Sequence, residues 1–322
     1  MTTGKRIALC IAAFLVMAAP PLFLNAYWVD VLNSVGLYAI LGLSLNLIVG
    51  SAGLFNLGHA AFYAIGAYTA AILNTTFHIP ILWLLPLCAV TAGLFALVVA
   101  RPIIHLRGDY LCIVTIGVGE IVRIALINNV FGLTGGANGI FGISRPTLFG
   151  HAIRKPDEFY WLIWSFAAIT VFLFHRLENS RFGRALNYIR DDEVAAEGCG
   201  VNTAHYKLAA FIVGAAWAGM AGDIYAAKMT IIAPESFSFW ESVLMFTLII
   251  LGGSGSIPGV LLGAFLIIGL PEVFREFANA RMLIFGAAMV VMMIFRTQGI
   301  LPARPRRYAT PPDPSCKAEA EA

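Results

Sequence analysis

Uncharged, strongly apolar stretches dominate the chain and predict membrane-spanning helices. Residues 31–100 contain no Asp, Glu, Lys or Arg, a run of 70 residues. At about 20 residues per bilayer crossing, this run is long enough for three helices. Shorter uncharged runs lie on either side of it, at Ile7–Val29, Ile124–Ser144, Phe159–Phe174, Leu208–Gly222, Ser242–Pro271 and Met282–Phe295. The pattern predicts an all-α, polytopic integral membrane protein.

About ten stretches have the length and hydropathy of a transmembrane helix. They are Ile7–Leu24, Asn33–Gly50, His59–Asn74, Ile81–Ala100, Asp109–Phe131, Phe159–Arg176, His205–Lys228, Phe239–Leu251, Gly255–Leu270 and Arg281–Arg296. Residues 1–301 are therefore expected to form one transmembrane domain. The remaining residues, 302–322, are rich in Pro, Arg, Ala and Glu, a composition that predicts a disordered tail.

Basic residues are distributed unevenly between the predicted loops, and this predicts the orientation of the chain. With a cytosolic N-terminus, the inner segments hold 14 Lys and Arg residues and the outer segments hold 6. This excess satisfies the positive-inside rule for an N-in, C-in topology. The overall composition, with 59% hydrophobic and 12% charged residues, argues against a soluble enzyme. No basic patch interleaved with aromatic residues supports nucleic-acid binding.

Glycine-rich segments interrupt the hydrophobic helices at two places, Gly50–His59 and Gly252–Gly259. Paired breaks of this kind are typical of a transporter pathway, where freed backbone groups line a polar cavity. The alternative is that these glycines form tight turns or close helix contacts. For His59, a hydrogen-bonded structural role is the alternative to a pathway role. The candidate pathway residues here are Asn46, Gly50, Gly53, Asn56, His59, Gly252, Gly253, Ser254 and Gly255.

Glu120 and Arg123 are charged residues inside a predicted span. Their spacing of three places them on one helix face. Charges within a bilayer usually face a cavity or pair with each other. The two residues therefore either line a substrate path or form an ion pair that orients the helix.

The segment 177–204 is predicted to be a structured cytosolic loop. Arg181–Arg190 has helical spacing, and the following acidic and alanine-rich stretch reads as a short capped helix. Asp191 or Asp192 supplies the N-cap, and Gly198 or Gly200 the end. Its adjacent alanines permit close approach by another protein surface, and its charges set the register. We interpret it as a docking element rather than a solvated connector.

The chain shows no sign of catalytic or cofactor chemistry. No lysine is followed by Ser or Thr, so the phosphate-binding loop of ATPases is absent. The five cysteines are scattered and the six histidines lie far apart, which predicts free thiols and no metal site. No cofactor is expected in this chain.

An ordered series of motifs resembles the permease family of branched-chain amino acid ABC transporters, LivM type. The series covers roughly residues 30 to 302: Leu43–Tyr68, Arg107–Tyr110, Leu133–Gly139, Gly183–Ala185, Ile189–Ala196, Pro234–Phe237, Gly252–Ser256 and Arg296–Gly299.

This resemblance implies the membrane half of an importer in the plasma (inner) membrane. The implied partners are a second permease of LivH type, two cytosolic ATPase subunits that bind ATP and Mg²⁺, and a periplasmic binding protein. ABC permeases carry a Glu-Ala-Ala-x-x-x-Gly coupling motif, whose best match here is Val194–Gly200, with Val194 in place of the Glu. The implied coupling residues are Arg184, Arg190, Asp191, Asp192, Glu193, Ala195, Ala196 and Gly200.

The resemblance implies transport of aliphatic amino acids, and other substrates stay open. Permeases for urea and short-chain amides look similar, and substrate specificity rests largely with the binding protein. A secondary transporter that works without ATPases is a further alternative, against which the structured docking loop argues. A membrane-embedded enzyme is a third, weakened by the lack of clustered titratable residues in the spans.

Overall fold

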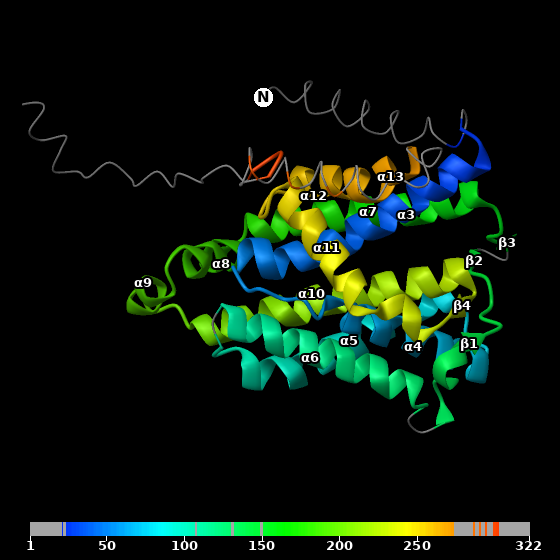
Figure 1. Ribbon diagram of the computed structural model, residues 1–322, viewed down its shortest axis with the longest axis horizontal. Helices are drawn as coiled ribbons and strands as arrows, with labels where there is room; N and C mark the ends of the chain where they lie inside the picture. Colours follow the sequence, from blue (N-terminus) through cyan, green and yellow to red (C-terminus); the bar gives the residue numbers. More distant parts are fainter. Residues whose placement is uncertain are drawn as a thin grey trace, which may run out of the picture.

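The structure, a computed structural model, describes residues 21, 24–106, 108–129, 132–148, 151–273, 286, 290, 294 and 299–302. Within these residues the chain is a bundle of long helices, with strands of two residues each in the connecting loops (Figure 1). The predicted spans Ile7–Leu24 and Arg281–Arg296 and the predicted tail, 302–322, lie almost entirely outside the described residues. The predicted all-α class is confirmed.

Six helical segments of the described chain are long and apolar enough to cross a membrane. The remaining apolar segment, Ile257–Val273, is shorter and consists of α12 (Ile257–Ala264), a π-helical turn (Phe265–Gly269) and α13 (Leu270–Val273). The six spans contain α3 (Ala26–Asn46), α5 (Leu85–Ile103), α6 (Asp109–Ile127), α7 (Pro156–Glu178), α10 (Thr203–Met229) and α11 (Phe239–Gly252). The predicted N-in, C-in orientation stays a prediction.

The first described span begins earlier than predicted. The predicted span starts at Asn33, whereas α3 already begins at Ala26 and includes Asp30. Asp30 is tolerated there because it lies at the end of the bundle and pairs with Lys228, with 2.9 Å between Oδ1 and Nζ. A charge at a helix end reaches water or a counter-ion and does not terminate the helix.

Helix α4 (His59–Phe77) lies in the centre of the bundle, against α10 and α5. Small residues allow this close packing. A Cβ atom on Gly66 would lie 2.1 Å from the carbonyl oxygen of Gly219, and one on Gly219 would lie 2.6 Å from that of Cys88. Close backbone approach through small residues is the usual basis of helix association in membranes. The predicted span His59–Asn74 corresponds to α4, which is not among the six segments of the described chain that are long and apolar enough to cross a membrane.

The long helices form two groups, which Figure 1 shows one above the other. One group contains α3, α7 and α12, and the other contains α4, α5, α6 and α10. Helix α11 joins them, since it contacts α3 and α12 on one side and α4 and α6 on the other.

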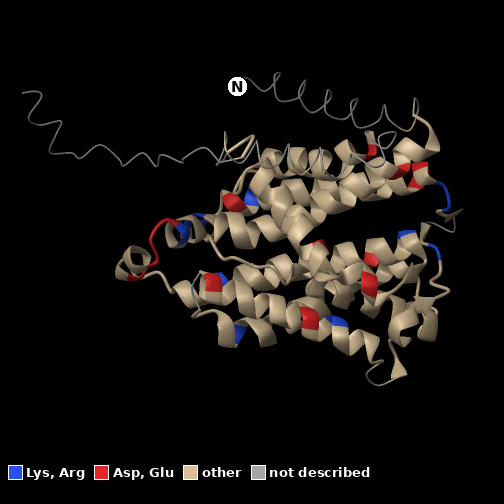
Figure 2. Cartoon of the chain, in the orientation of Figure 1, with Lys and Arg blue, Asp and Glu red and all other residues tan. Residues whose placement is uncertain are grey.

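The two ends of the bundle differ in structure and charge. At one end, α8 (Arg181–Asp191) and α9 (Glu193–Gly198) project beyond the long helices (Figure 1). At the other end, β1 (Ile140–Phe141) pairs with β4 (Ile231–Ile232), and β2 (Thr147–Leu148) pairs with β3 (His151–Ala152), both antiparallel. Charged residues gather near these ends and along the α8–α9 segment (Figure 2), as expected for a chain whose middle lies in lipid.

Candidate functional site

The two glycine-rich breaks, about 200 residues apart in sequence, contact each other directly. The backbone N–H of Gly255 donates a hydrogen bond of 2.8 Å to Oδ1 of Asn46. Opposite it, a Cβ atom on Gly50 would lie 2.4 Å from the Gly255 nitrogen. The two backbones approach this closely only because Gly50 carries no side chain. We call the contact of Asn46, Gly50 and Gly255 the break junction.

The first break begins with a widened helical turn. Helix α3 continues as a π-helical turn over Leu47–Ser51, and the chain then runs extended to α4. A π turn closes i to i−5 hydrogen bonds in place of i to i−4 ones, and the helix ends with this turn, so its last carbonyl oxygens have no partner within the helix. The carbonyl oxygen of Gly50 is one of these, because it accepts a 2.7 Å hydrogen bond from Nη1 of Arg190.

Arg190 connects the break junction to the segment 177–204, which we call the coupling segment because the family resemblance predicts that role. It lies at the end of α8, and its side chain passes beside Gly53, where a Cβ atom would meet Cγ of Arg190 at 2.9 Å. Gly53 also has a φ of +70°, a backbone conformation that favours glycine. The coupling segment therefore contacts the pathway candidates of α3 directly.

The second break is held by a segment near the end of the described chain. The N–H groups of Ile300 and Leu301 donate hydrogen bonds of 3.0 Å to the carbonyl oxygens of Leu251 and Gly252. A Cβ atom on Gly252 would lie 2.1 Å from the carbonyl oxygen of Gly259. Glycine therefore lets α11 turn sharply into α12. Gly253, with a φ of +120°, lies in this turn, and Ser254 is exposed on it.

Asn56 and His59, the polar candidate residues of the first break, have side chains buried inside the protein. Asn56 is fully buried, and its Oδ1 accepts a 3.0 Å hydrogen bond from the Gly58 N–H. His59 is also fully buried, with Nε2 at 2.8 Å from Oγ of Ser44. Among the described residues, Asn56 Nδ2 and His59 Nδ1 have no hydrogen-bond partner. Both side chains thus fix the junction between α3 and α4 and keep one polar atom each uncommitted.

The coupling segment is helical as predicted, and the structure shows which of the two candidate residues is the N-cap. Asp192 is the N-cap of α9, since its Oδ1 accepts hydrogen bonds of 2.9 and 3.0 Å from the N–H groups of Val194 and Ala195. Gly200, with a φ of +82°, follows the helix. Ala196 packs inward, whereas Val194 is 66% exposed and Ala195 is exposed beside it. This exposed apolar corner is the part of α9 available to another protein.

Ion pairs and hydrogen bonds anchor α8 and α9 to the long helices. Arg184 donates to the carbonyl oxygen of Asn179 at the end of α7, at 3.2 Å. Lys207 of α10, only 4% exposed, donates to Glu193. Thr203 donates a 2.6 Å hydrogen bond to Glu197. These bonds tie the segment to both α7 and α10.

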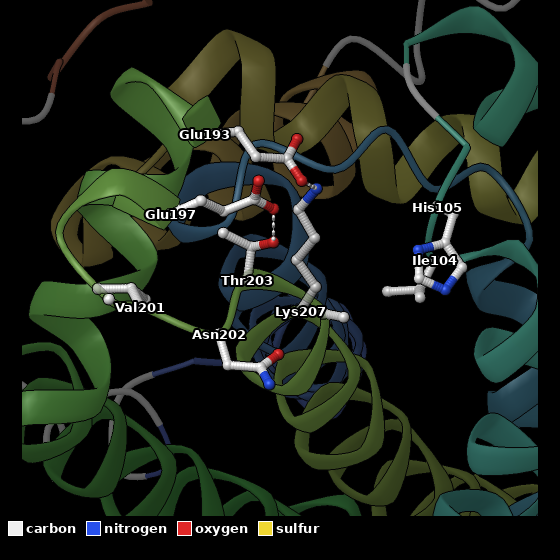
Figure 3. A pocket seen from close by; sticks show the side chains of 10 residues that line it. Ile104, His105, Glu193, Glu197, Val201, Asn202, Thr203 and Lys207 are labelled. Atoms are coloured by element: carbon white, nitrogen blue, oxygen red, sulfur yellow. Dashed lines mark hydrogen bonds and ion pairs between the residues drawn. The ribbon is translucent and has the colours of Figure 1, made fainter. Parts of the chain in front are cut away.

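A cavity of about 490 Å³ lies between the coupling segment and the start of α10. Its polar wall is formed by Glu193, Glu197, Thr203 and Lys207, and His105 faces them from the loop after α5 (Figure 3). Arg190 and Asp191 lie outside this cavity and approach each other at 3.4 Å between Nη2 and Oδ1. The coupling segment therefore presents a cavity with charged walls beside the exposed apolar corner of α9.

Glu120 and Arg123 lie apart from the break junction, on α6. Nε and Nη2 of Arg123 are both 2.9 Å from Oε2 of Glu120. Nη1 lies 3.9 Å from Oε1 of Glu235, in the 3₁₀ turn Pro234–Phe237 that precedes α11. The predicted ion pair exists, and the structure adds a second carboxylate to it.

Several residues of the site were not singled out from the sequence. Ser44 binds His59, Thr115 Oγ1 accepts from the Leu57 N–H at 3.2 Å, and Ser242 Oγ accepts from the Ala60 N–H at 3.0 Å. Small hydroxyl residues in apolar helices carry no distinctive spacing. Only the position of Ser44 inside the Leu43–Tyr68 motif offered a signal.

Asn46→Ala is expected to lower the free energy of unfolding by about 1–3 kcal/mol, because it leaves the Gly255 N–H without its acceptor. Thermal unfolding of the purified protein in detergent measures this. Asn138→Ala, at an exposed position in the loop between α6 and α7, is the matched control and should leave stability unchanged. Equal melting temperatures for the two variants would contradict the role of Asn46.

The apolar bundle, the paired helix breaks and the anchored helical segment at one end together define a multi-pass membrane transport permease. Sequence comparison gives its family. The family model described as branched-chain amino acid transport system / permease component matches residues 27–295, and the chain belongs to this family. It is accordingly a protein of the inner membrane.

The relatives agree with this assignment. The chain is 38% identical to the high-affinity branched-chain amino acid transport system permease protein LivM of Escherichia coli, over 94% of this chain and 76% of the relative. It is 26% identical to the LivH permease protein of the same organism, over 82% and 91%. A probable LivM of Methanocaldococcus jannaschii is 26% identical, over 86% and 93%. No solved structure matches the chain.

Proposed function

We propose that this chain is one of two permease subunits of an ATP-driven importer that moves branched-chain amino acids across the inner membrane. The observation that carries the proposal is the 2.7 Å hydrogen bond from Arg190 of the coupling segment to the Gly50 carbonyl oxygen at the break junction. Through this hydrogen bond, an ATPase that moves α8 and α9 also displaces the helices that border the pathway.

The chain's own part in transport is to convert a displacement at one end into a rearrangement of the breaks. Movement of α8 pulls on the Gly50 carbonyl through Arg190, and this carbonyl lies in the π turn that ends the helix, where the last carbonyl oxygens have no intrahelical partner. The break junction then transmits the shift to Gly255 and to the turn between α11 and α12. Packed helices have discrete alternative arrangements, so a small shift at such a junction selects between two states.

The proposed partners follow from the family and from what this chain lacks. A second permease of LivH type completes the pathway, and a binding protein delivers the substrate on the outer side. Two ATPase subunits bind ATP and Mg²⁺, since no lysine of this chain is followed by Ser or Thr as a phosphate-binding loop requires. This chain is accordingly a transport subunit and not an enzyme.

The substrate class is tested by uptake. A strain deleted for the gene of this chain should lose uptake of radiolabelled leucine and regain it on complementation. Uptake of labelled urea serves as the comparison, because urea is the substrate of the nearest alternative. Loss of urea uptake with unchanged leucine uptake would overturn the assignment, and leucine uptake without co-purifying ATPase subunits would favour a secondary transporter.

Ala195→Trp is expected to reduce leucine uptake by about tenfold or more, because a bulky ring on the exposed corner of α9 blocks a close protein contact worth at least 1.4 kcal/mol. Uptake and co-purification of the ATPase subunits are both measured. Ala195→Ser keeps the small side chain and should retain both. Normal uptake by Ala195→Trp would show that this corner of α9 does not meet the ATPase.

A further inference from the structure

The charged face of α6 does not fit contact with lipid. Of the six candidate spans, the one formed by α6 is the least enclosed, with 11% of its most apolar window buried. The Glu120 and Arg123 side chains on it are 34% and 25% exposed. A charged group exposed to hydrocarbon is strongly unfavourable, so intramembrane charges face a polar cavity or a protein partner. This face of α6 therefore borders the pathway or the second permease.

Exposed isoleucines share this face of α6 with the charged residues. Ile113, Ile121 and Ile124 are 66%, 67% and 50% exposed, and their spacing places them on one side of the helix. At 3.6 residues per turn, Glu120 lies within about 40° of Ile113 and Ile124, and Arg123 lies about 80° from Ile113 on the side away from Ile121. The exposed face of α6 therefore carries both apolar and charged side chains.

The geometry leaves one edge of the Arg123 guanidinium open. Nε and Nη2 are both engaged by Glu120 Oε2 at 2.9 Å. Nη1, by contrast, is 3.9 Å from Glu235, beyond hydrogen-bond distance. Arginine has five N–H donors in a planar fork, so the Nη1 edge keeps donors for a further acceptor. Glu235 itself is 77% exposed, so its carboxylate can accept hydrogen bonds from a ligand while Oε1 faces Nη1.

An open guanidinium edge beside a free carboxylate complements a zwitterion. The α-carboxylate of an amino acid accepts hydrogen bonds from Nη1, and its ammonium donates to Glu235. Both contacts are charge-assisted and therefore stronger than neutral hydrogen bonds. The corresponding α-keto acid lacks the ammonium, and the corresponding amine lacks the carboxylate.

The cluster lies away from the coupling segment, on the side where a substrate would enter. Arg123 is 14 residues from the start of α6 at Asp109, about 21 Å along the helix at 1.5 Å per residue. The loop before Asp109 contributes His105 to the cavity beside α9. The turn that carries Glu235 directly follows β4, among the strands at the opposite end of the bundle.

Building on the proposed transport function, we propose that Arg123 and Glu235 receive the zwitterionic head group of the amino acid at the outer end of the pathway, with Glu120 as the positioning residue for Arg123. The single-residue prediction is that Arg123→Gln lowers leucine transport about tenfold or more, the effect of losing one charge-assisted contact of about 1.4 kcal/mol or more.

The test uses the full complex reconstituted in vesicles with its binding protein, and measures leucine uptake and stimulated ATP hydrolysis per assembled complex. Arg123→Gln and Glu235→Gln should assemble, hydrolyse ATP when the loaded binding protein docks, and transport at least about tenfold less leucine. Arg145→Gln, at an exposed outer-loop arginine, is the charge-matched control and should transport normally.

A charge swap distinguishes substrate contact from an ion pair that only orients α6. Glu120→Arg combined with Arg123→Glu keeps an ion pair at the same spacing but moves the open guanidinium edge. The proposal expects transport to stay low in the swap. Restored transport would overturn it in favour of a structural pair, and loss of the second permease from the purified complex would overturn it in favour of a subunit contact. Failure of the unmodified complex to transport leucine would instead refute the proposed function.

Discussion

Gly50→Ala is expected to abolish leucine transport and to destabilise the protein by about 2–4 kcal/mol. The added Cβ would lie 2.2 Å from Asn46 Oδ1 and 2.4 Å from the Gly255 nitrogen. Backbone atoms cannot move aside cheaply, and overpacking of this kind costs about 1–3 kcal/mol. The displaced Asn46 also loses its hydrogen bond to Gly255, which adds about 1 kcal/mol.

Gly93→Ala is the matched control for this prediction. Gly93 also lies in the middle of a helix, but the nearest atom to its added Cβ would be Ile212 Cγ2, at 3.5 Å, which is ordinary van der Waals contact. Gly93→Ala should therefore fold and transport normally. Thermal unfolding in detergent and leucine uptake measure both variants. Similar stability of Gly50→Ala and Gly93→Ala would mean that the break junction is not tightly packed.

Arg190→Ala is expected to uncouple ATP hydrolysis from transport. The change removes the charge-assisted hydrogen bond to the Gly50 carbonyl oxygen, a contact worth about 1.5–3 kcal/mol, and with it the link between α8 and the break junction. ATP hydrolysis should continue because the exposed corner of α9 is unchanged. The ATP hydrolysed per leucine transported should rise by about tenfold or more, as a loss of 1.4 kcal/mol or more predicts.

Two further variants test whether the position, the charge or the planar guanidinium of Arg190 is what matters for coupling. Arg181→Ala removes an exposed arginine from the first residue of the same helix and should leave the ratio unchanged. Arg190→Lys keeps the charge but lacks the planar fork, and an intermediate ratio is expected. An unchanged ratio in Arg190→Ala would show that force reaches the bundle by another route, such as the Lys207–Glu193 pair.

Both predictions concern the break junction, where backbone segments outside regular α-helix are tightly packed. The π turn Leu47–Ser51 and the Gly252–Gly255 turn lack regular helical hydrogen bonds, yet side-chain and backbone groups from distant segments satisfy Gly50, Gly252 and Gly255. Such a junction can exchange one set of partners for another without unfolding the flanking helices. This is a physical basis for a helix hinge within a membrane.

Local patterns in the sequence predicted most of the described helices and narrowed the N-cap of α9 to two neighbouring residues. The uncharged runs predicted the membrane spans because lipid excludes charge over a fixed thickness. The capped coupling helix could be predicted because an N-cap depends on residues two or three positions apart, and Asp192 satisfies that rule. The ion pair of Glu120 and Arg123 followed in the same way from their spacing on one helix face.

Contacts between distant segments were decided by the tertiary structure alone. Nothing in the sequence indicates that the Gly255 N–H meets Asn46, that Arg190 reaches the Gly50 carbonyl oxygen, or that Glu235 joins the pair on α6. These partners are 209, 140 and 112 residues apart in sequence, and each contact depends on how whole helices pack. The sequence by itself indicated which segments are apolar enough to cross a membrane and where glycines interrupt them, because those properties are local. Which breaks meet, and which charges face the pathway, depends on the packing of the bundle.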